Sequence, residues 1–419
     1  MNSREQFIKT VNHRQPDRVV IDFGATPVTG IHVKTIEKLR KHFGLEERPV
    51  KVLEPYQMLG VVDDELINAI GIDVIGAWGK ENMFGFYNHA PYKEWVTPWG
   101  QLVAVPENFN TKTDEHGDIL MYPAGDMSVA PCAKMPKASY FFDAINRQEP
   151  IVEEELNVED NLEEFTLISD NDLEHWRVEV DKRYQTGKAV IAGFGGTALG
   201  DIALVPGLNL KAPKGIRDVT EWYMSTIMRP DYIKSIFAHQ VEISIENMKR
   251  IYEVVGNKVN AMFICGTDFG TQDSTFCAPE QYDDMWLPYY KEINDWIHQN
   301  TEWKTFKHSC GAVETFMDGF IRAGFDIINP VQISAAGMDP AKLKQKYGND
   351  LVFWGGGVDT QQVLPFGKPE EVREQVLKTC DIFTKNGGFV FNSVHNVQAG
   401  VPVENFIAMI DAIKEFNGE

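Results

Sequence analysis

The chain has 419 residues, of which 43% are apolar and 24% charged, a composition typical of one large globular domain with an elaboration. Its formal net charge of −21 would be repelled by nucleic acid and by anionic membrane surfaces, so we expect neither as a partner. The opening MNSREQFIKTV lacks the apolar core of a signal peptide, and no stretch approaches the ~18 apolar residues of a spanning helix. Five scattered cysteines fit a reducing compartment, and we therefore expect a cytoplasmic protein.

The N-terminal part alternates between helix and strand signals. A capping box at Ser3 and Gln6 predicts the first helix, and RVVIDFG and GIDVIGAW are predicted strands. The texture changes over residues 97–181, where a hairpin with its turn near His116 precedes the acidic run IVEEELNVEDNLEEF. We interpret 97–181 as an insertion or lid within a single domain that spans 1–419.

A regular alternation of strands and helices follows Gly187. The predicted strands are KAVIAGFGGT, NAMFICGTD, KTFKHSCG, DIINP, DLVFWGGGVD and GFVFNSVH, and prolines open several of the helices between them. One helix is predicted to begin at Pro279 and to bury a single face formed by Tyr282, Met285, Tyr289, Ile293 and Trp296. Short buried strands alternating with helices pair in parallel, and their number favours a (β/α)8 TIM barrel over a doubly wound sheet.

Polar side chains gather where these strands end. Asp268, His308 with Cys310, Asp359 and His395 follow four different strands at their carboxyl ends. TIM-barrel enzymes place their chemistry on that face. The sequence therefore predicts an active site at the mouth of the barrel.

The pair His308 and Cys310 suggests a metal. Residues two apart on a strand point the same way, so an imidazole and a thiolate can converge on one point. Zinc takes nitrogen and sulfur ligands, and His395 is the best candidate for a third. Three protein ligands leave one tetrahedral position open, as catalytic zinc sites do.

Plainer interpretations exist for the same residues. Cys310 could be a small buried residue and His308 a satisfied core histidine, but the pair's place on the barrel face favours a metal. The other cysteines at 132, 265 and 380 are expected to serve packing. Cys277 could be a fourth ligand or a residue at a helix start, and we favour the latter.

Three further residues have open roles. Asp268, together with Gln272, could bind substrate or fix the tautomer of a histidine ligand. Asp359 could equally cap the turn after its strand.

Several stretches carry a family likeness. REQFIKTVNHRQPDRV, VIAGFGGT, FCAPEQYDDMWLPYYKEI, FKHSCG, GFDIINP and GFVFNSVHNVQAGVPVENFIAMIDAI resemble, in order and spacing, the uroporphyrinogen decarboxylase (URO-D) superfamily. The likeness covers most of residues 1–95 and 187–416 and is closest to the zinc-dependent corrinoid methyltransferase branch, which includes methylcobalamin:coenzyme M methyltransferases. It implies a (β/α)8 barrel.

The two branches differ in chemistry. The decarboxylases need no metal and hold a porphyrinogen with arginines in an early loop and an aspartate after an early strand; here DFGATPVTG has no arginine and GAWGK no aspartate. The methyltransferases carry an H-x-C that matches His308 and Cys310, and a cysteine near the last strand end. His395 stands at that last place, and decarboxylases share a histidine there.

The resemblance implies a zinc-dependent methyltransferase. Zinc held by His308, Cys310 and His395 would bind an acceptor thiol or similar group, which exchanges a methyl group with a corrinoid. Asp268 and Gln272 would orient the substrate. His395 is a candidate catalytic residue as well as a candidate zinc ligand. The alternatives are a decarboxylase of tetrapyrroles and a non-catalytic barrel that binds a corrinoid or tetrapyrrole.

The corrinoid is expected to arrive on a partner. The chain has no D-x-H-x-x-G loop of corrinoid proteins, so a separate corrinoid protein would dock at the barrel mouth. Tyr56, Trp78 and Trp354 are candidates for an apolar pocket around the corrinoid. The resemblance is also compatible with a homodimer.

Overall fold

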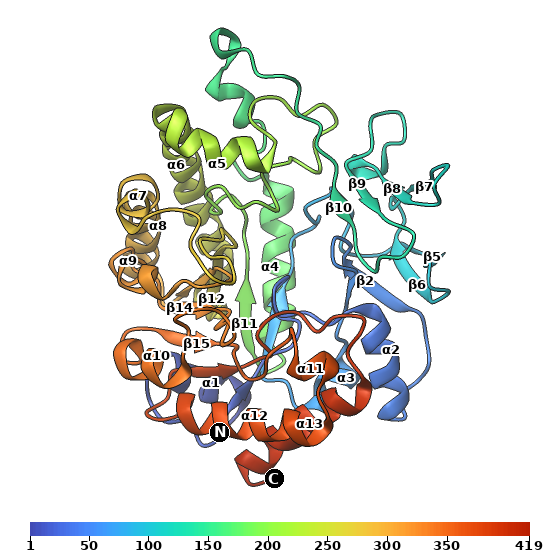
Figure 1. Ribbon diagram of the computed structural model, residues 1–419, viewed down its shortest axis with the longest axis vertical. Helices are drawn as coiled ribbons and strands as arrows, with labels where there is room; N and C mark the ends of the chain where they lie inside the picture. Colours follow the sequence, from blue (N-terminus) through green and yellow to red (C-terminus); the bar gives the residue numbers. More distant parts are fainter.

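Eight parallel strands form a nearly closed barrel in the computed structural model, which describes residues 1–419 (Figure 1). In sheet order the strands are β1 (Val20–Ile21), β16 (Phe389–Phe391), β15 (Val352–Trp354), β14 (Ile327–Asn329), β13 (Lys304–His308), β12 (Ala261–Cys265), β11 (Ala189–Ala192) and β4 (Val74–Ala77). Every neighbouring pair in this order is parallel. The predicted (β/α)8 fold is therefore confirmed.

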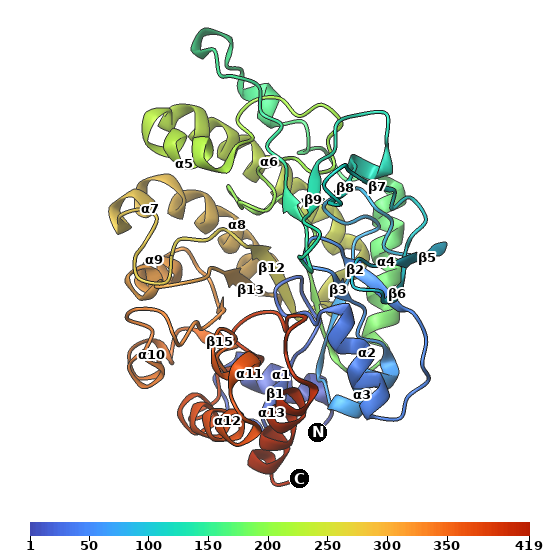
Figure 2. The same ribbon diagram turned by 45° about the vertical axis from the view of Figure 1, so that its right-hand side comes forward.

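Helices cover the outside of the barrel, as the views in Figures 1 and 2 show. The helices of the chain are α1 (Ser3–Val11), α2 (Val33–His42), α3 (Asp64–Ile70), α4 (Asp170–Tyr184), α5 (Val219–Met228), α6 (Pro230–Val255), α7 (Pro279–Met285), α8 (Leu287–Asn300), α9 (Met317–Arg322), α10 (Pro340–Tyr347), α11 (Val363–Phe366), α12 (Pro369–Phe383) and α13 (Val403–Asn417). Of these, α1 closes the amino end of the barrel, where Phe7 and Val11 pack against the residues inside it. None of the helices combines the length and the apolar character that crossing a bilayer would require.

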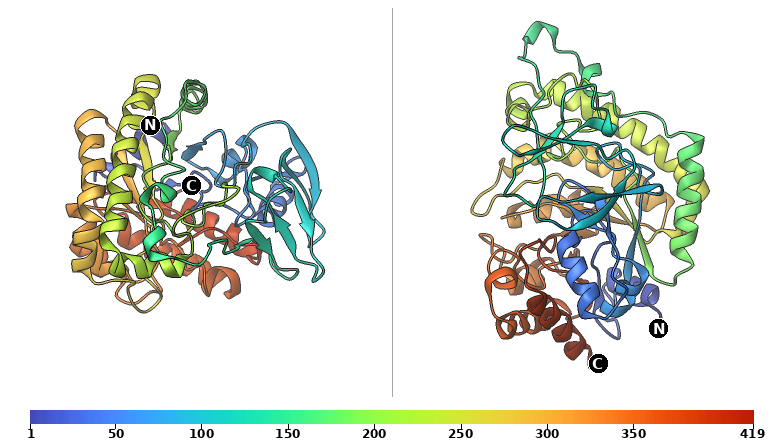
Figure 3. Two further views of the ribbon diagram at one scale, coloured as in Figure 1. Left: turned by 90° about the horizontal axis from the view of Figure 1, so that it is seen from above. Right: turned by 90° about the vertical axis from the view of Figure 1, so that its right-hand side faces the viewer.

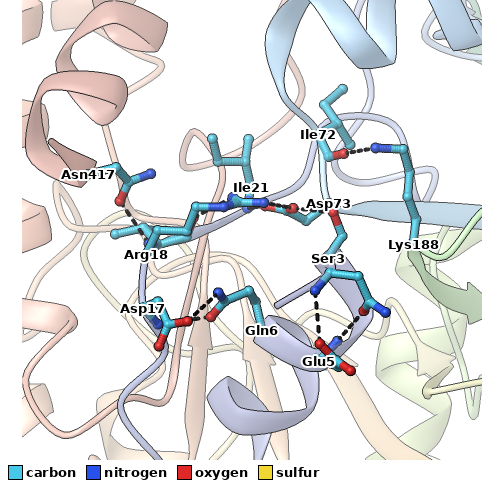
Figure 4. A network of polar contacts seen from close by, with 12 residues as sticks. Ser3, Glu5, Gln6, Asp17, Arg18, Ile21, Ile72, Asp73, Lys188 and Asn417 are labelled. Atoms are coloured by element: carbon cyan, nitrogen blue, oxygen red, sulfur yellow. Dashed lines mark hydrogen bonds and ion pairs between the residues drawn. The ribbon is translucent and has the colours of Figure 1, made fainter. Parts of the chain in front are cut away.

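A buried aspartate closes the barrel between its two outermost strands, β1 and β4. The backbone N–H of Asp73 donates to the carbonyl of Ile21 at 2.8 Å, and the Asp73 carboxylate accepts from the N–H of Ile21 at 3.0 Å. Arg18 pairs with the same carboxylate at 2.7 Å, and the hydroxyl of Ser3 donates to it at 2.6 Å (Figure 4). This network lies at the amino ends of the strands, where barrels keep stabilising rather than catalytic residues.

Two small four-stranded sheets, one antiparallel and one mixed, flank one side of the barrel (Figure 3, left). One holds β3 (Leu59–Gly60), β2 (Val50–Glu54), β6 (Leu102–Pro106) and β5 (Tyr92–Val96), with the β2–β6 pair parallel. The other holds β10 (Asp143–Ala144), β9 (Ala133–Met135), β8 (Ile119–Met121) and β7 (Thr111–Thr113). The predicted hairpin around His116 joins β7 and β8.

The predicted bounds 97–181 differ from the observed ones at both ends. The added strands begin at Tyr92 and recruit β2 from before the predicted start. At the other end, α4 is a helix of the barrel itself, because it contacts β4, β11 and α6 and buries Trp176 and Val180 one turn apart. A role of the added strands as a lid stays a prediction.

Two helix details also differ. The capping box lies one residue earlier than predicted, with Asn2 as N-cap and Glu5 as its partner. The helix from Pro279 is two helices, because Pro288 opens a new one and shifts the buried face by one residue. As a result Tyr290 is buried where Tyr289 was predicted.

Candidate metal centre and its cavity

Three potential ligands converge at the carboxyl ends of β13 and β16. His308 is the last residue of β13, Cys310 lies two residues beyond it, and His395 follows β16 by four residues. Their nearest nitrogen and sulfur atoms all lie within 4.8 Å of one another. The structure thus brings together the three residues that the sequence predicted as a set.

The ring of His308 is oriented for metal binding by Asn329, the last residue of β14. The Asn329 amide nitrogen donates to the carbonyl of Trp354 at 2.9 Å, so its oxygen faces His308 Nδ1 at 2.6 Å. His308 therefore carries its proton on Nδ1, and the lone pair of Nε2 is free for a metal. Burial lowers the pKa of His308 to about 4, which keeps the ring neutral near pH 7.

Cys310 supplies the sulfur. Its Sγ lies 3.3 Å from His308 Nε2. Tetrahedral zinc with ordinary bond lengths would hold such atoms about 3.5 Å apart, so the observed spacing fits a shared ion. The backbone N–H of Cys310 donates to Asp268 Oδ1 at 2.6 Å, which fixes the loop that carries the thiol. Burial, with Asp268 nearby, raises the pKa of the Cys310 thiol well above its usual value, so ionisation requires a cation beside it.

His395 is held differently from His308. The backbone N–H of Asn396 donates to its Nδ1 at 2.8 Å, so the neutral ring carries its proton on Nε2. Burial lowers the pKa of His395 to about 4, and its ring centre is 5.3 Å from that of His308. In this tautomer His395 is set to donate a hydrogen bond. It becomes a third ligand only when the bond to Asn396 is released.

A cavity of about 880 Å³ opens at the barrel mouth and includes the three candidate ligands and Asp268 among its lining residues. Tyr56 and Trp78 line it, as predicted. Trp354 does not, and its predicted place in the pocket is wrong. It is fully buried inside the barrel, where its indole N–H donates to Asp22 at 2.9 Å and its ring packs against Phe306.

Other predicted residues lie away from the centre. Gln272 does not line the cavity; its side chain donates to the carbonyl of Ser334 at 2.6 Å and accepts from Gln332 at 2.8 Å. Asp359 caps the turn after its strand by accepting three backbone N–H groups. Cys277 is half-buried near the start of α7 and outside the ligand cluster.

Sequence reasoning missed three residues of the site. Asn329 ends the DIINP strand, and the strand-end rule that selected His308 could have found it. Glu54 and Asp201 also line the cavity. Glu54 comes from an added strand and Asp201 from the loop after β11, and neither carries a local sequence signal.

Comparisons with known proteins agree with the barrel. Residues 211–416, about half of the chain, match the family model described as uroporphyrinogen decarboxylase (URO-D). A uroporphyrinogen decarboxylase from Psychromonas ingrahamii is 32% identical over 80 residues, which are 19% of this chain and 22% of that relative's length. A methyltransferase from Methanosarcina mazei shares the fold, with a TM-score of 0.56, 13% identity and 99% of each chain covered. Together with the eight parallel strands, the match places residues 211–416 of this barrel in the uroporphyrinogen decarboxylase (URO-D) family.

Proposed function

We propose that the chain is a zinc-dependent methyltransferase that moves a methyl group between a corrinoid on a partner protein and a small thiol or similar acceptor. The observation that carries this proposal is the cluster of His308, Cys310 and His395 at the open end of the barrel. One imidazole and one sulfur, joined by a second imidazole once His395 gives up its bond to Asn396, form a donor set that zinc prefers and leave a position for substrate.

The chain's own residues would divide the work. His308 and Cys310 would hold the ion, with the His308 ring kept in the binding tautomer by Asn329. Zinc, when bound, supplies a Lewis acid that lowers the pKa of an acceptor thiol. Asp268 holds the Cys310 loop, and His395 lies beside the other two ligands as a hydrogen-bond donor or, once its bond to Asn396 is released, as a ligand. The cavity volume of about 880 Å³ lies within the range of small-molecule sites.

The cavity's charge disfavours the alternative of porphyrinogen decarboxylation. A substrate with many carboxylates needs cations in its site. No arginine lines the cavity, and Lys80 is its one lysine. Lys80 lies 4.0 Å from Asp172 and so already faces an acidic partner.

A demethylation assay tests the proposal. Zinc-loaded protein is mixed with free methylcobalamin and 2-mercaptoethanol, and loss of the methyl–cobalt absorbance is followed. We expect thiol-dependent demethylation, and we expect Cys310→Ala to abolish it. The control variant Cys277→Ala should retain it, because Cys277 is half-buried and lies outside the cluster.

Two results would overturn the proposal. Decarboxylation of a porphyrinogen by the metal-free protein would favour the second branch of the family. Tight corrinoid binding without turnover, indifferent to chelators, would favour a carrier or sensor.

A further inference from the structure

The walls of the barrel cavity are strongly acidic. Besides Lys80, the charged side chains that line it are six carboxylates, from Glu54, Glu81, Glu164, Asp172, Asp201 and Asp268. Two of the six have a cation beside them: Glu164 pairs with Arg217 at 2.7 Å, and Asp172 lies 4.0 Å from Lys80. A cavity with walls of one sign concentrates ligands of the opposite sign.

Two of these carboxylates are buried without a cationic partner. Glu54, 6% exposed, accepts the backbone N–H groups of Tyr56 at 2.6 Å and Gln57 at 2.9 Å. Asp201, 8% exposed, accepts those of Ala203 at 2.9 Å and Gly266 at 3.0 Å. No ion pair forms at either carboxylate.

Burial dominates their titration, and Lys307, which forms no ion pair with Asp201, only partly opposes it there. Burial raises the pKa of Glu54 to about 7 and that of Asp201 to about 6. A cation in the cavity would stabilise both carboxylates as anions beyond what their backbone N–H partners do.

Aromatic rings share the same walls. Tyr56, Trp78, Trp176 and Phe194 line the cavity, and the rings of Trp176 and Phe194 pack edge to face at 4.8 Å between centres. Aromatic faces attract organic cations, and more strongly where water is excluded. Carboxylates and aromatic rings together form the surroundings that suit an alkylated ammonium group.

We propose that the small-molecule substrate of this cavity carries an organic cation of the alkylated ammonium class, beside the thiol or similar group that would meet the zinc, and that anions are excluded. This inference deepens the proposed function, since it names the substrate class of the same site, and it rests on that function for the cavity's use. It follows from the charges and rings of the walls, not from the metal ligands.

Three probes of nearly equal shape test the charge alone. Choline, 3,3-dimethylbutan-1-ol and 3,3-dimethylbutanoate are titrated by calorimetry into the metal-free protein at pH 8. We expect choline to bind at least about tenfold more tightly than the neutral alcohol and the carboxylate to bind least. Equal affinities, a reversed order, or no binding of any probe would refute the inference.

Variants locate the effect. Glu54→Gln and Asp201→Asn should each weaken choline binding several-fold and leave binding of the alcohol unchanged. Glu115→Gln is the matched control, because Glu115 lies in the β7–β8 turn with 87% of its side chain exposed. The probes need neither zinc nor corrinoid. Failed methyl transfer with the expected probe order would therefore count against the proposed function alone, and the reverse pattern against this inference alone.

Discussion

Replacing Asn329 by leucine tests how the proposed metal centre is held in shape. The change removes the acceptor 2.6 Å from His308 Nδ1 and the donor 2.9 Å from the Trp354 carbonyl. A buried N–H without a partner costs about 1–3 kcal/mol. Loss of a group that orients a metal ligand lowers metal affinity about 10–100-fold. Each factor of ten is about 1.4 kcal/mol, so this loss of affinity is similar in size to the cost of the unpaired N–H.

The assay is competition for zinc against a chromophoric chelator. We expect Asn329→Leu to bind zinc 10–100-fold more weakly, and Asn329→Asp, which keeps an acceptor, to bind at least as well as the native chain. Asn405→Leu is the control: Asn405 is also buried and donates two hydrogen bonds, at 2.8 and 2.9 Å, but lies on α13 away from the cluster. A folded Asn329→Leu protein with the zinc affinity of the native chain would show that the tautomer argument is wrong.

Three further predictions concern residues beyond the ligands. Burial raises the pKa of Asp22 to about 7, so the folded protein holds this proton more tightly than the unfolded chain, and stability falls as the pH rises from about 4 to 7. The free energy of unfolding is measured in urea at a series of pH values. Asp22→Asn should reduce its fall over this pH range by up to about 4 kcal/mol. The same fall in the variant and the native chain would mean that Asp22 is ionised in the folded protein. Asp73→Ala should lower the free energy of unfolding by about 2–4 kcal/mol, because Arg18 loses its partner at the barrel seam, and a loss below the scatter of surface variants would contradict that role. Gln272→Ala should change zinc affinity less than about twofold, because Gln272 lies outside the cavity. A large loss of zinc affinity would mean that Gln272 does support the metal centre.

The barrel could be predicted because each of its strands carries its own signal. Runs such as Val352–Trp354 are apolar throughout, since strands in a parallel sheet are covered on both faces. The added sheets lack this signal. Val50 pairs with Val103, and such distant pairing of short half-exposed strands leaves little trace in the sequence.

Site residues could likewise be predicted where they end barrel strands. Asp268, His308, Cys310 and His395 could be found because strand ends meet at one face. Trp354 misled because it also ends a strand, yet its indole lies inside the barrel.

Tautomers and wall charges could not be predicted. The tautomers depend on the positions of single groups such as the Asn329 amide. The charge of the cavity walls depends on loops that lie together only in the folded chain.

Element analysis of the purified chain shows whether the cluster holds zinc. We expect about one zinc per chain, lost in His308→Ala and in Cys310→Ala and retained in Cys277→Ala. His395→Ala decides the third ligand: a loss of zinc makes His395 a ligand, and retained zinc makes it a hydrogen-bond donor. A folded chain without zinc, or with zinc that survives Cys310→Ala, would mean that the cluster is not a zinc site.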